Sequence, residues 1–174
     1  MKRFVFVLAL STLVGFSLFS QINATVTEIS GRVEVKLPKE EWKPAEVGMA
    51  LSNGTFISTG FKSEAKLLVG PSEVNVRQLT RMELDQLVAQ GDTLTTGINL
   101  RVGNLRANVN TAEGLSNDFQ IRTPVSTAAV RGTQLDVTRV AGGMDLKVIK
   151  GEVVMFPTPI TVSYTHLRAH ETDS

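Results

Sequence analysis

Apolar and polar residues alternate along most of this chain, between about residue 25 and residue 156. In residues 33–37, three apolar side chains alternate with Glu34 and Lys36, and residues 65–69 and 98–102 show the same alternation. A period of two places successive side chains on opposite faces of a strand, so it is typical of strands that are buried on one face. Shorter stretches of the same kind lie at residues 74–79, 105–109, 119–122, 135–138, 146–149 and 153–155.

Turn-forming residues separate these segments at short intervals. Pairs such as Asn53-Gly54 and Gly103-Asn104 supply the positive φ angles that tight hairpins need. About nine short strands separated by such turns predict an all-β fold, either an antiparallel β-sandwich or a β-roll.

Two segments differ from this pattern. Residues 80–90 are compatible with a helix or with a strand, because their apolar positions fit both periods. Residues 38–44, bounded by Pro38 and Pro44, are interpreted as a surface loop, since proline lacks the N–H that a central strand needs.

The N-terminus has the three parts of a secretory signal peptide. Lys2 and Arg3 are positively charged, residues 4–19 are mostly apolar, and a short polar stretch ends at the small residue Ala24. We expect cleavage after Ala24, and therefore export to the periplasm or out of the cell. An uncleaved membrane anchor is the alternative, but the apolar stretch is shorter than the roughly 20 residues that span a bilayer.

The C-terminal end shares no pattern with the residues before it. Residues 162–172 (VSYTHLRAHET) resemble a translated sequencing-library transposon adapter, a contaminant of metagenome assemblies. An amphipathic tail is the alternative, but the apolar residues keep neither a strand period nor a helix period. We therefore leave residues 162–174 out of the functional reasoning. Residues 25–161 are treated as one domain, truncated at its C-terminal end.

This domain lacks the side chains that most catalytic sites use. The 174-residue chain contains no cysteine, and both histidines and the single tyrosine lie beyond residue 161. Disulfides, Ser-His-Asp triads and the usual zinc ligands are therefore excluded from the domain. Glycine-rich phosphate-binding motifs do not occur either. We expect no catalytic residue, no metal site and no cofactor.

Charge and carboxylate positions point to no other chemistry. The net charge of the whole chain is +1, and the domain itself has fifteen basic and fifteen acidic residues, so nucleic acid is not an expected partner. A hydrolase with two carboxylates is the remaining enzymatic hypothesis. However, acidic residues such as Glu34, Asp136 and Asp145 occupy the polar positions of strands, as exposed sheet faces require. No acidic loop suggests a calcium site.

Residues 122–133 (RTPVSTAAVRGT) form the most unusual segment. Pro124 removes a backbone donor and keeps Thr123 extended, and Gly132 permits a bend or bulge before the next strand. Arg131 carries five N–H donors that can hold neighbouring carbonyl groups. We interpret the segment as a corner where the chain crosses the sheet, held by Arg131. A binding lip is the alternative.

The same segment resembles the hallmark pattern of the FecR family of periplasmic domains. A second shared pattern lies upstream in residues 47–67, and residues 103–107 and 148–153 correspond to later strands of the family. The resemblance extends over residues 29–154, and we expect its motif residues to be structural. These residues are Gly48, Gly54, Thr59, Gly60, Thr123, Pro124, Arg131, Gly132 and Thr133.

The resemblance implies a non-enzymatic all-β module on the outer side of the inner membrane. The best-known members of the family relay the occupancy of an iron-siderophore receptor to a cytoplasmic sigma factor, through a cytoplasmic segment and a membrane helix. Here only the predicted signal peptide, residues 1–24, precedes the domain. We therefore do not transfer the iron-signalling role to this chain.

The leading hypothesis is an exported, non-catalytic module of the cell envelope, sensory or regulatory, whose partner is an envelope protein or a glycan. Sheet edges or residues 38–44 would present the binding surface, for instance by strand addition. After signal cleavage we expect no segment that spans the membrane. The alternative hypothesis is a structural envelope or surface component whose C-terminal region is missing from this sequence.

Overall fold

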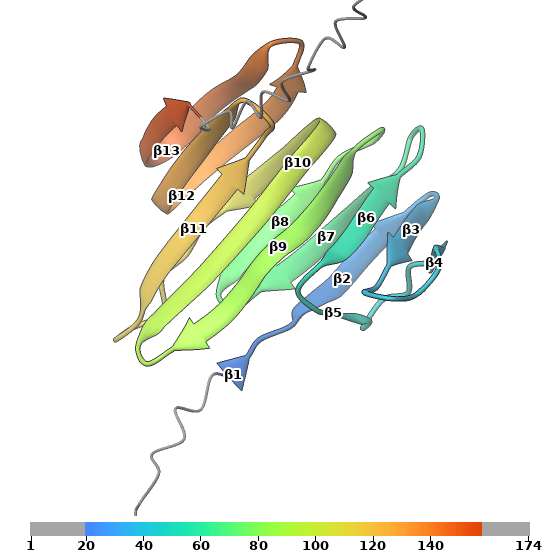
Figure 1. The fold of residues 1–174 in the computed structure, drawn as a ribbon, viewed down its shortest axis with the longest axis horizontal. Coiled ribbons are helices and arrows are strands. Elements are labelled where there is room, and N and C mark those ends of the chain that lie inside the picture. Colours follow the sequence, from blue (N-terminus) through green and yellow to red (C-terminus); the bar gives the residue numbers. More distant parts are fainter. Residues whose placement is uncertain (1–19, 158–174) are drawn as a thin grey trace, which may run out of the picture.

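The computed structural model describes residues 20–157, in which all regular structure is β-strand (Figure 1). Thirteen strands form one sheet. They are β1 (Ser20–Gln21), β2 (Ala24–Ser30), β3 (Val33–Lys36), β4 (Lys43–Pro44), β5 (Ala50–Leu51), β6 (Thr55–Thr59), β7 (Glu64–Val69), β8 (Ser72–Val76), β9 (Arg81–Gln90), β10 (Thr93–Asn108), β11 (Ser116–Arg122), β12 (Ser126–Val140) and β13 (Gly143–Pro157).

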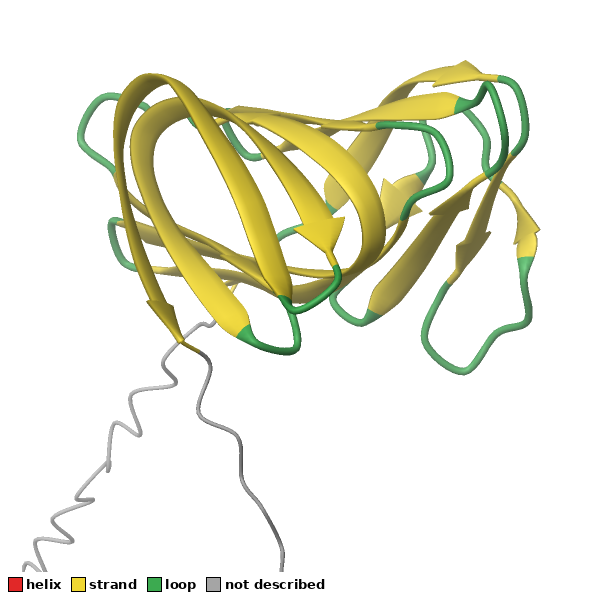
Figure 2. Ribbon diagram, turned by 90° about the horizontal axis from the view of Figure 1, so that it is seen from above, coloured by secondary structure: helices red, strands yellow, loops and turns green. Residues whose placement is uncertain are grey.

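The sheet curls on itself, so that its strands lie in two layers around a common interior (Figure 2). One layer has the order β3-β6-β9-β10 and the other the order β2-β7-β8-β10. The first half of β10 pairs with β9 and its end pairs with β8, so this strand passes from one layer into the other. The all-β fold and its roll-like curvature are therefore confirmed.

The strands differ from the expected ones in number and length. β10 has 16 residues, and β12 and β13 have 15 each, because Gly103, Gly132 and Gly151 bend these strands at positive φ angles without ending them. β10 and β11 pair in parallel, which is an exception to the antiparallel arrangement that we expect from the sequence.

The ambiguous segment, residues 80–90, is strand β9. Asp85 is an extra residue in this strand, because Gly97 pairs with Gln86 and the next residue of β10 already pairs with Leu84. This bulge shifts the alternation, so Leu84 and Leu87 are both fully buried although they are three residues apart. A β-bulge thus explains the helix-like spacing of the apolar residues.

The core lies between the two layers and consists mainly of aliphatic side chains, with Phe119 as its one aromatic residue among residues 20–157. Residues 38–44 form a loop that ends in the short edge strand β4, so Pro44 lies at an edge of the sheet, as predicted. The largest fully buried aliphatic side chains are Leu51, Ile57, Leu67, Met82, Leu84, Leu87, Ile98, Leu100, Leu105, Ile121 and Leu135.

Residues 1–19 and 158–174 lie outside the described part of the chain, and with them most of the predicted signal peptide and the suspected adapter. Ala24, after which we expect cleavage, is the first residue of β2; it is buried and pairs with Leu51 and Val69. Cleavage there would remove the first residue of this strand. Within residues 20–157, no helix is present that could cross a membrane.

Candidate functional site

The first group of motif residues lies where strands pass from one layer to the other. Thr59, at the end of β6, is buried, and its Oγ1 donates to the backbone oxygen of Arg77 and accepts from the N–H of Thr80 at 3.0 Å. The backbone N–H of Gly60 donates to the oxygen of Arg32 at 2.9 Å. These bonds connect β6 to the chain segments before β9 and before β3. Thr59 and Gly60 therefore stabilise a corner of the roll.

Gly48 and Gly54 lie in turns that flank β5. Both have positive φ angles, 87° and 79°, which favour glycine. The N–H of Gly48 donates to the oxygen of Val26 at 2.8 Å, and that of Gly54 to the oxygen of Leu84 at 2.6 Å. These two glycines attach the turns to β2 and β9, so their role is conformational.

Thr123 and Pro124 form the tight turn between β11 and β12. The N–H of Thr123 donates to the oxygen of Ser126 at 2.8 Å, and the Thr123 Oγ1 accepts from the N–H of Ser126 at 3.1 Å. Pro124 is exposed at the second position of this turn, where its fixed φ is favourable. The pair therefore sets the geometry of the hairpin.

The second corner of the roll is formed by Gly132 and Thr133. β12 pairs with β11 through residues 127–130 and with β10 through residues 134–139, so the strand changes its pairing partner at Gly132 and Thr133. The β12–β13 register also shifts here, which confirms the expected bulge at Gly132. The buried Thr133 Oγ1 lies 2.8 Å from the backbone oxygens of both Arg131 and Glu152.

Arg131 points away from this corner. Its side chain is exposed and makes no hydrogen bond or ion pair with any residue in the range 20–157. Together with Asp118, Glu152 and Val154 it lines a shallow hollow outside β11, β12 and β13. Thr133, and not Arg131 as expected from the sequence, holds the neighbouring carbonyl groups.

The nine motif residues are therefore not gathered in one pocket. They lie at two corners and in three turns, which is the distribution expected of residues that shape the backbone. Among residues 20–157, no cluster of three or more His, Cys, Asp or Glu side chains is arranged to hold a metal ion.

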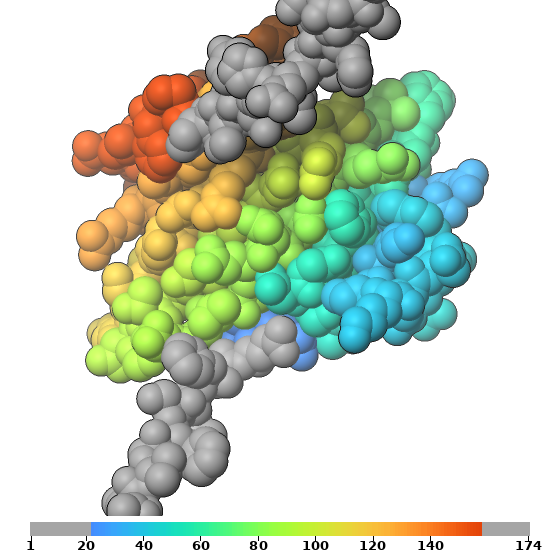
Figure 3. Space-filling view, in the orientation of Figure 1, coloured from blue at the N-terminus to red at the C-terminus, as the bar shows by residue number. Residues whose placement is uncertain are grey.

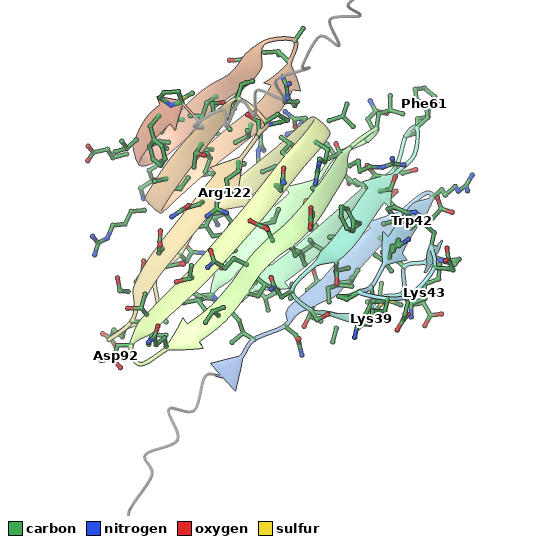
Figure 4. The ribbon with its side chains drawn as sticks, in the orientation of Figure 1. Lys39, Trp42, Lys43, Phe61, Asp92 and Arg122 are labelled. Carbon is green, nitrogen blue, oxygen red and sulfur yellow. The ribbon has the colours of Figure 1, made fainter. Side chains whose placement is uncertain are left out.

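A different surface brings together aromatic and basic side chains, and we name it the Trp42 surface. It lies around a hollow of about 490 Å³ on the outer face of the sheet, near the 38–44 loop (Figure 4). Its members come from β3, the loop, β6, β9 and β10, which the strand pairing places side by side. The residues of the Trp42 surface are Lys36, Trp42, Phe56, Arg81 and Arg101.

Trp42 is held in position while it remains accessible. Its side chain is 38% exposed, and the guanidinium carbon of Arg81 lies 5.5 Å from the centre of its ring, a cation–π distance. Arg101 pairs with Glu83 at 3.0 Å, whereas Lys36 forms no ion pair with a residue in the described part of the chain. Three basic groups thus surround two aromatic rings, with one carboxylate nearby.

A charge pair with two hydrogen bonds lies outside the Trp42 surface. Arg106 on β10 and Asp136 on β12 are directly opposite each other, and the guanidinium donates two hydrogen bonds to the carboxylate, of 2.7 and 2.8 Å. The bonds from Arg106 hold the pKa of Asp136 below its ordinary value, although partial burial acts in the opposite direction. This carboxylate therefore has a structural partner.

A comparison with models of known protein families identifies the family of this chain. A model of the family described as FecR protein matches residues 55–154, more than half of the chain. The chain belongs to the FecR family. The match begins at the first residue of β6 and includes both corners of the roll, whereas Gly48, Gly54 and Trp42 lie before it.

Two crystal structures of a protein from Parabacteroides distasonis, provisionally described as an anti-sigma factor, resemble this FecR chain. Each has 19% sequence identity and a TM-score of 0.43, with 58% of this chain and 50% of the other covered. The FecR chain thus spans about half the length of that protein. No curated protein matches this chain.

Proposed function

We propose that this chain is an exported, non-catalytic FecR module of the cell envelope, sensory or regulatory, which binds an envelope protein or a glycan through the Trp42 surface. Membership of the FecR family supports a regulatory module. The sequence of residues 1–24, with its charged start and apolar stretch, supports export.

The Trp42 surface is the observation that carries the proposal. An accessible tryptophan supplies a large, flat apolar contact area, and tryptophan and arginine are the residue types that dominate binding energy in interfaces. Arg81 already orients the Trp42 ring, so little side-chain freedom is lost when a partner binds. Lys36 and Arg101 favour a partner that carries acidic groups, whether these are carboxylates of a protein or of a glycan.

The test is a quantitative pull-down from solubilised envelope extract, with the wild-type chain, Trp42→Ala and Phe61→Ala as baits. Phe61 is a matched control because it is also an exposed aromatic residue, at 69%, but lies outside the Trp42 surface. We expect a partner that the wild type and Phe61→Ala retain and that Trp42→Ala loses at least tenfold. Retention should also weaken as salt is raised, because charge contributes to it.

Two results would count against this function. If no protein or glycan is retained under any condition, the chain is not a binding module. If Trp42→Ala retains the same partner as well as the wild type, binding uses another surface. Trp42 is the only tryptophan of the chain, so its fluorescence gives a second, direct reading of binding by the purified partner.

A further inference from the structure

Strand β13 is the last strand at one end of the sheet, and it has a long edge without a pairing strand in the described part of the chain. It has 15 residues and pairs only with β12 among the strands of residues 20–157. It lies at the end of the molecule opposite β3 and β4 (Figures 1 and 3). The two-residue strand β4, which contains Pro44, offers almost no backbone for pairing at its end of the sheet.

The inner face of β13 is apolar and incompletely covered. Met144, Leu146 and Val153 pack against the core, but Val148 and Met155 remain 41% and 48% exposed. Because these side chains continue the core beyond the last strand, another strand next to β13 would cover them. Within the described residues, no strand beside β13 covers these apolar side chains at this end of the sheet.

The outer face of β13 carries charges in a self-complementary order. Ile149 is an extra residue in β13, because Val148 pairs with Leu135 and Lys150 already pairs with Gln134. This bulge shifts the alternation, so Leu146 and Val153 share the inner face although they are an odd number of residues apart. Their neighbours Lys147 and Glu152 therefore share the outer face. Lys147 lies before the bulge and Glu152 after it, and Lys150 lies between them on the same face.

We propose that a second copy of this chain pairs with β13, antiparallel and edge to edge, about a two-fold axis between Ile149 and Lys150. In this register Lys147 lies opposite the partner's Glu152 and Glu152 lies opposite the partner's Lys147. On the inner face, Leu146 lies opposite the partner's Val153. Each residue on one face thus meets a residue on the same face, as strand pairing requires.

The charges select this register over its neighbours. A shift by two residues in one direction would place Lys147 opposite the partner's Lys150 and Asp145 opposite the partner's Glu152, which are like charges. A shift in the other direction would leave Lys147 opposite the partner's Val154. Of these three registers, only the proposed one places Lys147 and Glu152 opposite each other, while Lys150 lies opposite the partner's Ile149.

The bend of β13 is compatible with the same axis. Gly151 lies close to the axis. The part of β13 before Gly151 in one copy therefore runs beside the part after Gly151 in the other copy. A two-fold axis of this kind makes a closed, isologous dimer. This proposal does not depend on the partner of the Trp42 surface.

Sedimentation velocity of the purified chain over a range of concentrations tests the proposal. We expect a dimer that dissociates on dilution, since one pair of edge strands makes a small interface. Lys147→Glu alone and Glu152→Lys alone should each weaken dimerisation at least tenfold, because each places like charges opposite each other twice. Lys39→Glu is the matched control, as it makes the same charge change in the loop at the far end of the sheet (Figure 4).

The decisive experiment mixes the two variants. A chain with Lys147→Glu and a chain with Glu152→Lys have opposite charges at both central positions, so the mixture should form a heterodimer about as strong as the wild-type dimer. Far-ultraviolet circular dichroism of each variant confirms that it is folded. The proposal is overturned if the wild type is monomeric at every concentration, if either charge reversal leaves the dimer unchanged, or if mixing does not restore it.

Discussion

The guanidinium of Arg106 and the carboxylate of Asp136 lie face to face across strands β10 and β12, joined by two hydrogen bonds of 2.7 and 2.8 Å. The Asp136 side chain is 19% exposed, and Arg77 approaches the same carboxylate at 3.7 Å. The pair connects the second half of β10 to β12. Hydrogen bonds from Arg106 lower the pKa of this carboxylate, so the contact is sensitive to acid.

The stability of the fold should therefore depend on pH through Asp136. Since its folded-state pKa is lowered, chiefly by hydrogen bonds from Arg106, the ionised carboxylate stabilises the fold at pH values above its unfolded-state pKa. This stabilisation is lost as the pH falls through the lowered pKa, below about pH 4. Urea unfolding of the wild type and of Asp136→Asn should differ at pH 7 and converge in acid. A difference that stays constant down to pH 2 would contradict this explanation.

Gly103 is the glycine that should tolerate substitution least. Its φ is 97°, and a Cβ atom there would lie 2.5 Å from the Cα of Thr80 and 2.7 Å from the backbone oxygen of Leu79. Because both obstacles are backbone atoms, Gly103→Ala should destabilise the fold by about 3 kcal/mol or more.

The control for this prediction is Gly142→Ala. Gly142 has a similar φ of 85°, but no atom lies within 4 Å of the added Cβ, so only the backbone strain of about 1 kcal/mol should remain. Thermal or urea unfolding of both variants measures the difference. Equal losses would mean that the corner at Gly103 relaxes easily.

The local pattern of the sequence was sufficient to predict an all-β fold, either a sandwich or a roll, the turns and a bend or bulge at Gly132, because alternation and turn residues act over a few neighbouring positions. The Trp42 surface could not be predicted in the same way. Phe56, Arg81 and Arg101 become neighbours only through the pairing of β6, β9 and β10. That register depends on contacts between residues distant in the chain.

The role that we expected for Arg131 from the sequence was wrong for a different reason. Its five donors suggest a clamp on neighbouring carbonyl groups, yet Val130 is buried, so alternation alone places Arg131 on the outer face. The bulge at Gly132 then returns Thr133 to the interior. The five N–H donors of Arg131 indicate which groups it could bind. The period of the strand indicates where its side chain points, and it predicts the observed outward orientation.

Thr59 should be the motif residue whose hydroxyl contributes most to the first corner. Its buried Oγ1 both accepts from the N–H of Thr80 and donates to a backbone oxygen. Thr59→Val keeps the shape but leaves these groups unpaired, so we expect a loss of about 1–3 kcal/mol. Thr27→Val is the matched control, because the Thr27 hydroxyl makes one exposed hydrogen bond, to Lys66. Its effect in urea unfolding should stay within about 0.5 kcal/mol.

At the second corner, Thr133 should contribute more to stability than Arg131. Thr133→Val removes a buried hydroxyl that lies 2.8 Å from two backbone oxygens, and we expect it to destabilise the fold by about 1–2 kcal/mol. Arg131→Ala removes an exposed side chain without a partner among residues 20–157, so its effect on stability should be within about 0.5 kcal/mol. Urea unfolding of both variants decides between the two residues. If Arg131→Ala proved as damaging as Thr133→Val, the arginine would hold the corner after all, through contacts that form outside the described residues.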